Sequence, residues 1–352
     1  MRCAVFVATA HGIALAGKLR QELEGTVDVF VKKGRDVPWE AYRYEQLSDT
    51  VRTLFTRYDA LIFCMAVGIV VRLIAPCLKS KLTDPAVVVV DERANYAISL
   101  LSGHVGGANR LTERVAAILG AVSVITTATD VNHYLAPDGL ATELGLRPEP
   151  KPEIQTINGA LLEGKNVAWY IDSQLRRAAF YQKRLAEKKI DVRLLSADEI
   201  LRREGMKVFI TDSPILETSG LLNLVPRRLA AGIGCRRGVP AALIRGALEA
   251  ACARIGQDIN AVSILASTVV KKNEAGILEV AKALNVEVCF YENEALEEKI
   301  TEYHLAESPF VKRTIGVGNI SEAAALCALK EGRVALAKTK FTKVTVALVW
   351  EK

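Results

Sequence analysis

The chain has few of the residues that usually build metal and redox sites. Its 352 residues include only four histidines, His11, His104, His133 and His304, and no two of them have the spacing of a metal-ligand pair. The seven cysteines form no Cys-x-x-Cys pair, and their number is odd. This pattern is typical of reduced thiols in a cytoplasmic protein, and it argues against a disulfide framework and against a dedicated metal site.

Long apolar segments are also missing. The longest strongly apolar run, residues 60–71, is too short for a transmembrane helix, which needs about 20 residues. The apolar segment at residues 1–17 is interrupted by His11 and Gly12 and continues as the pattern of a strand and a helix. We therefore interpret it as part of the fold and not as a signal peptide, and we expect a cytoplasmic protein without a membrane partner.

Composition predicts an ordinary globular chain. Hydrophobic residues make up 50% and charged residues 24%, which excludes a disordered protein, and the length suggests two or three domains. The net charge is +6, but the basic residues are scattered and form no massed run. The sequence therefore gives no reason to expect a nucleic-acid partner, whereas a mild positive excess suits an anionic small molecule.

Short apolar strands alternate with amphipathic helices in the first and last thirds of the chain. Residues 3–8, 60–65 and 86–90 have the composition of buried strands, and residues 107–119 that of a helix ending at Gly120. This alternation predicts an α/β protein with parallel sheets in its N-terminal and C-terminal domains. We expect an N-terminal α/β domain at 1–130, a small variable α/β middle domain at 131–225 and a C-terminal α/β domain at 226–352.

Polar side chains follow two neighbouring strands of the first domain. Asp91 and Glu92 come directly after the buried strand 86–90, and His104 stands in a glycine-rich turn after the next strand. Because the ends of adjacent strands lie on the same edge of a parallel sheet, the carboxylates could orient the imidazole. A histidine can act as a general base near neutral pH. The alternative is a tight packing turn with a solvated histidine.

The same turn places three glycines before a helix. Gly103, Gly106 and Gly107 precede Asn109, and glycines at a helix start let backbone N–H groups approach an anion or a developing oxyanion. The pattern is neither the Gly-x-Gly-x-x-Gly fingerprint nor a phosphate-binding loop with its lysine. We therefore expect a site for an anion or an oxyanion here, and no bound nucleotide.

Two further segments of the first third combine polar groups with turns. Thr126, Thr127, Asp130 and Asn132 follow a predicted strand and offer hydroxyls, a carboxylate and an amide within a few residues. Arg72 follows the strand-to-loop turn at residues 65–68. Each segment is a candidate for substrate contact, with a capping or structural turn as the alternative.

The last third carries pairs of basic residues near predicted strand ends and glycine turns. They are Arg236 and Arg237 in the segment GIGCRRG, Lys271 and Lys272 before a helix, and Lys312 and Arg313 before the segment GVGN. Such groups can pair with carboxylates or phosphates, although each pair alone is more often solvated surface. Ser321 could cap the helix that follows, and Cys235 has no nearby histidine that would make it a nucleophile.

Six of these segments together resemble the CbiG family of anaerobic cobalamin biosynthesis over nearly the whole chain. They are DPAVVVVDER, ISLLSGHVGGAN, ITTATDVN, VPRRLAAGIGCRRG, STVVKKNEAG and FVKRTIGVGNISEAAA, in the order and spacing of the family. The segment at residues 65–68 departs from the pattern, because it reads Met-Ala-Val-Gly where relatives often have a turn like Gly-Ala-Thr-Gly. The middle third matches weakly.

The resemblance implies a hydrolase that opens the δ-lactone of the ring-contracted cobalt tetrapyrrole cobalt-precorrin-5A. Acetaldehyde would then leave, giving cobalt-precorrin-5B. The cobalt would be carried by the substrate, so we expect no protein cofactor or metal site. Candidates for the catalytic base are His104, Asp91, Glu92 and Asp130. Candidates for substrate binding are Arg72, Gly103, Gly106, Gly107, Asn109, Thr126, Thr127, Asn132, Arg236, Arg237, Lys271, Lys272 and Arg313.

Other functions remain as alternatives to the hydrolase. A non-catalytic tetrapyrrole carrier would resemble the last third alone, but it would not need the motifs of the first domain. A tetrapyrrole methyltransferase would need a glycine-rich loop after the first strand, where this chain reads Thr-Ala-His-Gly at 9–12. A nucleotide-binding regulator is the least specific alternative. A homodimer is a possible assembly.

Overall fold

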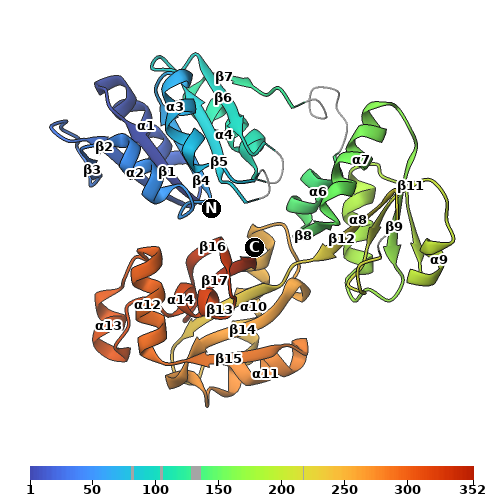
Figure 1. Cartoon of the computed structure of the whole chain (residues 1–352). Coiled ribbons are helices and arrows are strands. Elements are labelled where there is room, and N and C mark those ends of the chain that lie inside the picture. The colour runs from blue at the N-terminus through green and yellow to red at the C-terminus, as the bar shows by residue number, and fades with distance from the viewer. Residues whose placement is uncertain (81–82, 104–105, 128–135, 217) are drawn as a thin grey trace. The chain divides into compact units, whose positions relative to one another are not determined.

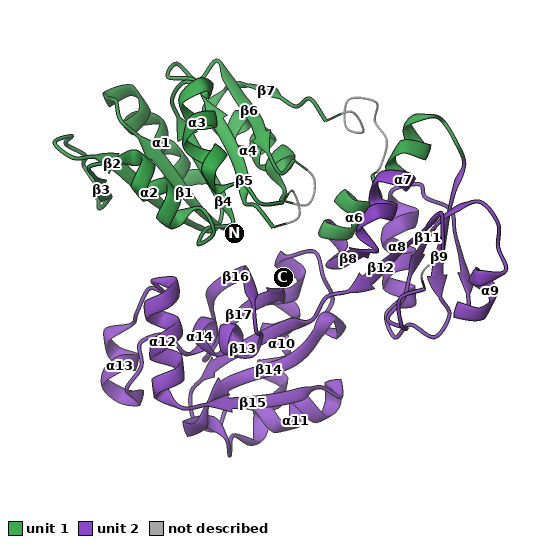
Figure 2. Ribbon diagram, in the orientation of Figure 1, with its two compact units in different colours: residues 1–142, 158–165 green, residues 143–157, 166–352 purple. Residues whose placement is uncertain are grey.

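The computed structural model describes residues 1–80, 83–103, 106–127, 136–216 and 218–352. Three β-sheets are present, and helices accompany each of them (Figure 1). The chain divides into two compact units, residues 1–142 with 158–165 and residues 143–157 with 166–352 (Figure 2). The first sheet belongs to unit 1, and the third sheet belongs to unit 2.

The first sheet has seven strands in the order β3-β2-β1-β4-β5-β6-β7. The strands are β1 (Arg2–Val7), β2 (Thr26–Lys32), β3 (Tyr42–Tyr44), β4 (Ala60–Cys64), β5 (Ala86–Val90), β6 (Tyr96–Leu101) and β7 (Val122–Val124). The helices are α1 (Ala10–Glu22), α2 (Leu47–Leu54), α3 (Val67–Ile74) and α4 (Ala108–Leu119), with a 3-10 turn at Ala75–Cys77.

Both faces of this sheet are covered by helices. On β1, Val5 packs with α1 and α4 in one apolar cluster, whereas Phe6 packs with α2 and α3 in another. The strands are therefore buried on both sides, which explains why they read as continuous apolar runs rather than as alternating ones. The predicted α/β domain with a mainly parallel sheet is confirmed.

The direction of one strand in the first sheet differs from our expectation. β5 pairs with β6 in the antiparallel direction, with Val88 opposite Ser99 and Val90 opposite Ala97. The short connection Asp91–Asn95 between them forms a hairpin, since a parallel crossover needs a dozen or more residues. β7 pairs parallel to β6, so the carboxyl ends of β6 and β7 share the edge opposite to the carboxyl end of β5.

The second sheet lies in the middle third and has the order β10-β9-β11-β12-β8. Its strands are β8 (Leu146–Glu149), β9 (Val167–Asp172), β10 (Val192–Leu195), β11 (Met206–Ile210) and β12 (Leu221–Pro226). The helices of this part are α6 (Pro137–Leu144), α7 (Lys151–Leu162), α8 (Ala178–Glu187) and α9 (Ala197–Leu201). Only β8 is antiparallel to its neighbour.

The third sheet has the order β15-β14-β13-β17-β16. Its strands are β13 (Leu229–Cys235), β14 (Val262–Thr268), β15 (Glu287–Tyr291), β16 (Gly332–Phe341) and β17 (Val344–Glu351). The helices are α10 (Ala241–Arg254), α11 (Ala275–Leu284), α12 (Asn293–Tyr303), α13 (Pro309–Ile315) and α14 (Ile320–Cys327), with 3-10 turns at Ile259–Ala261 and Val269–Lys271. β13, β14 and β15 are parallel to one another.

Helix α14 lies very close to β13. A Cβ atom added to Gly232 would come within 1.8 Å of the carbonyl oxygen of Ser321, so only glycine fits on the strand at this point. The predicted helix is confirmed, but its predicted cap is wrong. Asn319 is the N-cap and accepts a hydrogen bond from Glu322 N, whereas Ser321 is fully buried inside the first turn.

The fold class predicted from the sequence is confirmed for the first and third sheets. No helix in the described ranges is both long enough and apolar enough to cross a bilayer. The domain boundaries at residues 130 and 225 remain a prediction.

Candidate functional site

The glycine-rich turn between β6 and α4 is tightly built. A Cβ atom on Gly106 would lie 2.4 Å from Ser102 Cβ, and one on Gly103 would lie 2.6 Å from Asn109 Oδ1. Gly107 is the N-cap of α4 and has a φ of 82°, in the left-handed region that favours glycine. Each of the three glycines is therefore required by a close approach or by the backbone conformation.

Asn109 holds this turn to the neighbouring strands. Its side-chain oxygen accepts a hydrogen bond from Ser99 Oγ at 2.6 Å, and its Nδ2 donates to Thr127 Oγ1 at 3.1 Å. Because β6 and β7 are parallel, the turn after β6 and the threonines after β7 lie at the same edge of the sheet. The structure therefore brings Gly103, Asn109 and Thr127 together, with Thr126 exposed beside them.

Asp91 and Glu92 lie at the opposite edge, because β5 and β6 are antiparallel. The expectation that the ends of these two strands share an edge is wrong, and so is the argument that the two carboxylates orient a side chain of the glycine turn. Asp91 instead closes the β5–β6 hairpin by accepting hydrogen bonds from Arg93 N at 2.9 Å and Tyr96 N at 2.6 Å. Glu92 is exposed, with its carboxylate 3.9 Å from His11 Nδ1.

Three predicted site residues, His104, Asp130 and Asn132, lie outside the described residues. Arg72 is described, and its guanidinium donates to the carbonyl oxygen of Gly68 within α3 at 2.8 Å while remaining exposed. The roles of these four residues therefore remain predictions from the sequence.

The basic segments of the last third meet at one edge of the third sheet. β13 and β14 are parallel and end at Cys235 and Thr268, so the loops that carry Arg236, Arg237 and Lys272 leave the same edge. All three side chains are exposed. These groups form the cationic edge of the third sheet.

The end of α13 lies near the same edge. β15 also ends there, and Asn293, which follows it, donates from Nδ2 to the carbonyl oxygen of Ile315 at 2.8 Å. Arg313, in the last turn of α13, is exposed. Lys312 is engaged within the protein, with Nζ 2.8 Å from Glu307 Oε2. Arg313 therefore lies near this edge without an ion-pair partner among the described residues, whereas the charge of Lys312 is already paired with Glu307.

Lys271 differs from the neighbouring basic residues because it is buried. Its ammonium lies 2.9 Å from Glu274 Oε1, and only 8% and 11% of the two side chains are exposed. Glu274 Oε2 also accepts a hydrogen bond from Gly238 N at 2.9 Å. Glu274 therefore ties the loop after β13 to the loop after β14, and the structure gives Lys271 an internal partner rather than a free position for substrate.

The groups around Glu274 favour the charged form of its carboxylate. Burial works to raise the pKa of Glu274, but the hydrogen bonds from Lys271 and Gly238 outweigh it, and the pKa lies below its usual value. Burial raises the pKa of the neighbouring Cys235 thiol. A neutral, partly buried thiol is a poor nucleophile, which agrees with the absence of a nearby histidine in the sequence.

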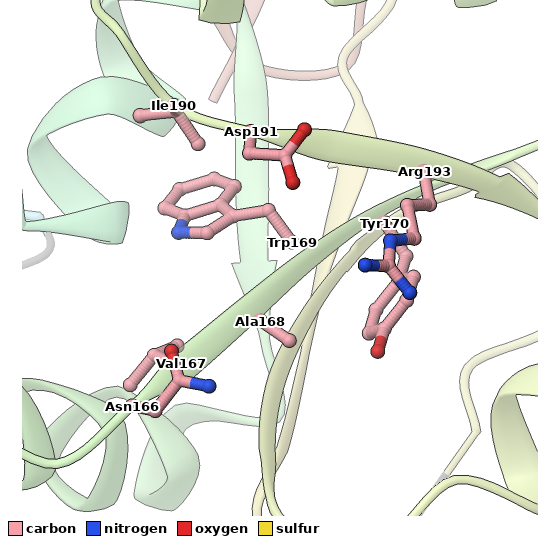
Figure 3. A pocket seen from close by; sticks show the side chains of 8 residues that line it. All are labelled: Asn166, Val167, Ala168, Trp169, Tyr170, Ile190, Asp191 and Arg193. Carbon is pink, nitrogen blue, oxygen red and sulfur yellow. The ribbon is translucent and has the colours of Figure 1, made fainter.

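A separate cavity of about 480 Å³ lies in the middle third, between β9 and the start of β10. The Trp169 ring lies below Ile190 and Asp191, and the Arg193 guanidinium lies beside Tyr170 (Figure 3). None of the predicted site residues lines this cavity.

Sequence reasoning missed two residues that the structure makes prominent. Ser102 directly follows the last residue of β6, and its φ of 58° is unusual for a residue with a side chain. Glu274 stands three residues after Lys271, a spacing at which an ion pair could have been expected.

Three family models match successive parts of the chain. Cobalamin synthesis G N-terminal matches residues 49–130, and the cobalamin biosynthesis central region matches residues 135–224. Cobalamin synthesis G C-terminus matches residues 229–349. The first and last ranges contain the glycine turn and the cationic edge, respectively.

Curated relatives match along almost the whole length. The chain is 36% identical to the cobalt-precorrin-5A hydrolase of Salmonella typhimurium, over 98% of this chain and 96% of that protein. It is 32% identical to the cobalt-precorrin-5A hydrolase of Priestia megaterium, over 98% of this chain and 94% of that protein.

A solved structure supports the fold. A cobalamin biosynthesis protein G homolog from Sulfolobus solfataricus superposes with a TM-score of 0.59 at 22% identity, covering 100% of this chain and 97% of that one. Identity this low supports the fold alone. The family models and the two curated relatives establish the membership, and the chain belongs to the cobalamin synthesis G family, CbiG.

Proposed function

We propose that this chain is a cobalt-precorrin-5A hydrolase, an enzyme that opens the δ-lactone of the cobalt tetrapyrrole and releases acetaldehyde. The observation that carries the proposal is identity of 36% and 32% to two proteins of that name over 98% of the chain. A carrier would account only for the last third, whereas the similarity extends through the glycine turn of the first sheet.

The glycine turn is where we place the hydrolysis. Water adds to the lactone carbonyl and forms a tetrahedral oxyanion, which needs hydrogen-bond donors fixed in advance. The start of α4 offers backbone N–H groups, and the N-terminal end of a helix favours negative charge. His104 is our first candidate for the base that activates the water, with Asp130 as the second.

The cationic edge of the third sheet is where we place recognition of the substrate's carboxylates. Arg236, Arg237 and Lys272 are exposed there, and guanidinium groups pair with carboxylates in a bidentate manner. We do not assign Lys271 to the substrate, because Glu274 already neutralises its charge. The cobalt belongs to the substrate in this proposal, and the protein supplies no cofactor.

The direct test is to incubate the purified protein with cobalt-precorrin-5A and assay acetaldehyde. We expect acetaldehyde release in buffer treated with a metal chelator and without added nucleotide, flavin or S-adenosylmethionine. Tight binding of the substrate without any release would favour the carrier instead. A requirement for a nicotinamide or for S-adenosylmethionine would contradict hydrolysis as the reaction.

A further inference from the structure

Ser102 has a strained backbone at the end of β6. Its φ is 58°, in the left-handed region that a residue with a Cβ atom adopts only at a cost. The next residue is Gly103, so the chain uses glycine beside this position but retains a serine at it. Strained non-glycine residues of this kind concentrate at functional sites, where the surrounding structure holds them in place.

The Ser102 hydroxyl is also buried without a partner. The residue is 9% exposed, and its Oγ makes no hydrogen bond with any described residue. The hydroxyl of Ser99, three residues earlier, does have a partner, because its Oγ donates to Asn109 Oδ1 at 2.6 Å. A buried polar group without a partner is uncommon and costs stability, which calls for an explanation of why it is retained.

The Ser102 side chain begins directly beneath the start of α4. Its carbonyl oxygen accepts a hydrogen bond from Ala108 N at 3.1 Å, and its Cβ lies where a side chain on Gly106 would have to go. α4 is 12 residues long, and its N-cap, Gly107, has no side chain to cap it. The buried hydroxyl therefore lies at a helix start that has no side-chain cap.

Some of the backbone donors at this helix start are also unpaired, although Ala108 N and Asn109 N donate to the carbonyl oxygens of Ser102 and Gly103 at 3.1 Å. No described residue accepts a hydrogen bond from the N–H groups of Gly106, Gly107 or Arg110. The first N–H groups of a helix have no partners within the helix, and the helix dipole adds positive potential at this end. An orphan hydroxyl and three orphan N–H groups thus lie in the segment that joins β6 to α4 and in the first turn of α4, where an acceptor would find free donors.

We infer that the Ser102 hydroxyl is a catalytic hydrogen-bond donor to the oxyanion that forms during lactone hydrolysis. The inference rests on the proposed function. Water adds its oxygen to the lactone carbonyl carbon and gives a proton to the base. The ring C–O bond then breaks, and its electron pair leaves on the ring oxygen as an alkoxide. Ser102 keeps its own proton throughout.

An unpaired donor suits this role energetically. A hydroxyl that is already bonded within the protein would have to break that bond before it could stabilise the oxyanion. Ser102 has no such bond to lose among the described residues, so its interaction is gained when charge develops in the transition state. The cost of burying and straining the residue is then borne in the free enzyme.

The substitution Ser102→Gly separates catalysis from folding. Glycine removes the hydroxyl and also relaxes the left-handed backbone, so the variant should have a melting temperature equal to or above that of the wild type. We expect kcat for acetaldehyde release to fall by about 10²–10³-fold, as for loss of an oxyanion donor, with KM nearly unchanged. A Ser102→Gly variant with the kcat of the wild type would overturn the inference.

Thr112→Val is the matched control. Thr112 is fully buried in α4, and its Oγ1 also lacks a partner among the described residues, but it is one turn further from the helix start. Replacing it with the similarly shaped valine should leave kcat unchanged. An equal loss of activity in both variants would show that any buried hydroxyl in or next to α4 matters, which contradicts a specific donor role for Ser102.

Two further outcomes are distinguishable. An acyl-enzyme adduct on Ser102, detected by intact-protein mass spectrometry after rapid quenching, would make the serine a nucleophile and overturn the donor role. If the wild type releases no acetaldehyde from cobalt-precorrin-5A, the proposed function fails and the donor role fails with it. Loss of activity confined to Ser102→Gly, in a wild type that is active, supports both.

Discussion

Asp91 shows how one carboxylate can be interpreted in two ways. It follows a buried strand, which is typical of a catalytic position in an α/β sheet, but it also accepts backbone hydrogen bonds that close the hairpin. We expect Asp91→Ala to lower the free energy of unfolding by roughly 1–2 kcal/mol through loss of these bonds. Its kcat should match the wild type, measured by acetaldehyde release alongside urea denaturation. A large fall in kcat at unchanged stability would restore Asp91 as a catalytic group.

His104 lies outside the described residues, so its role must be tested directly. Histidine is a common general base in enzymes, and loss of a base typically lowers the rate by about 10²–10⁴-fold. We expect His104→Asn to retain the fold and substrate binding and to lose kcat by that factor. His11→Asn is the control, because His11 is exposed and should leave kcat unchanged. An active His104→Asn variant would make Asp130 the next candidate.

Substitution of Glu274 shows how much stability depends on the ion pair of the buried Lys271, compared with the exposed Lys272. Glu274→Gln leaves the buried Lys271 ammonium uncompensated, and breaking such a pair costs about 3–5 kcal/mol. Lys272→Gln, at an exposed neighbour, should cost almost nothing in thermal stability. Equal melting temperatures for the two variants would contradict a structural role for the ion pair.

The same carboxylate has a predictable pH dependence. Because folding lowers the pKa of Glu274, its stabilising contribution is complete above the ordinary glutamate pKa and is lost as the pH falls through the lowered value. The wild type should therefore approach the stability of Glu274→Gln in acid, and the difference between them should be largest near neutral pH.

At the scale of elements, the sequence predicted those with a clear apolar pattern. The strand 86–90 has the predicted bounds, and the helix predicted at 107–119 begins one residue later, because a run of valines and a regular apolar stripe leave little choice. The direction of β6 was predicted wrongly, as parallel to β5. The shortness of Asp91–Asn95 already excluded a parallel crossover, so the missing step was to compare the connection length with the topology.

The strand β16 was missed for a different reason. It is an edge strand that pairs only with β17, and its sequence includes Lys338 and Lys340. Charged residues are common at sheet edges, where they prevent pairing with other chains, but they hide the apolar pattern of a strand. Pairing of this kind depends on the partner strand, which local sequence does not reveal.

The residues of the candidate sites also fall into a predicted group and a group that was not predicted. The glycines, Asn109 and Thr127 were predicted because turn chemistry is local and strand ends gather at an edge. The pairing of Lys271 with Glu274 and the orphan state of Ser102 were not predicted. Both depend on which groups happen to be nearby after folding, and a basic residue looks the same in sequence whether it is free or paired.

Gly106, in the turn before α4, and Gly120, at the C-terminal end of α4, give a matched test of the turn's geometry. Gly120 is the left-handed C-cap, and a Cβ atom there meets nothing within 4 Å, so Gly120→Ala should cost about 1 kcal/mol without changing kcat. Gly106→Ala would place its Cβ 2.4 Å from Ser102 Cβ, which displaces the turn. Since a misplacement of about 1 Å can cost 10²-fold in rate, we expect a fall of that order in kcat. Equal kcat in both variants, by acetaldehyde assay, would show that the turn does not act in catalysis.

At the scale of the whole molecule, the proposed chemistry and the proposed recognition belong to different compact units. The glycine turn is part of unit 1, and the cationic edge of the third sheet is part of unit 2. Interactions made equally with substrate and transition state change KM, whereas those made only in the transition state change kcat. Substitutions in the glycine turn should therefore act mainly on kcat, and substitutions at the cationic edge mainly on KM.

The net charge of +6 and the exposed arginines lead to a prediction about salt. Exposed charges are screened within about 8–10 Å at physiological ionic strength, so attraction of a substrate with several carboxylates should weaken as salt is added. We expect KM to rise with ionic strength while kcat stays nearly constant. The double variant Arg236→Ala/Arg237→Ala should raise KM by about two- to thirtyfold, since exposed ion pairs contribute about 0.2–1 kcal/mol each. It should also flatten the salt dependence of KM.

The control for this prediction removes the same charge elsewhere. Arg52→Ala/Arg57→Ala takes two exposed arginines from unit 1, so the net charge changes equally while the cationic edge stays intact. If recognition is local, KM and its salt dependence remain those of the wild type in this control. If both double variants raise KM alike, the substrate responds to the net charge of the whole protein, and the assignment of its carboxylates to Arg236 and Arg237 is wrong.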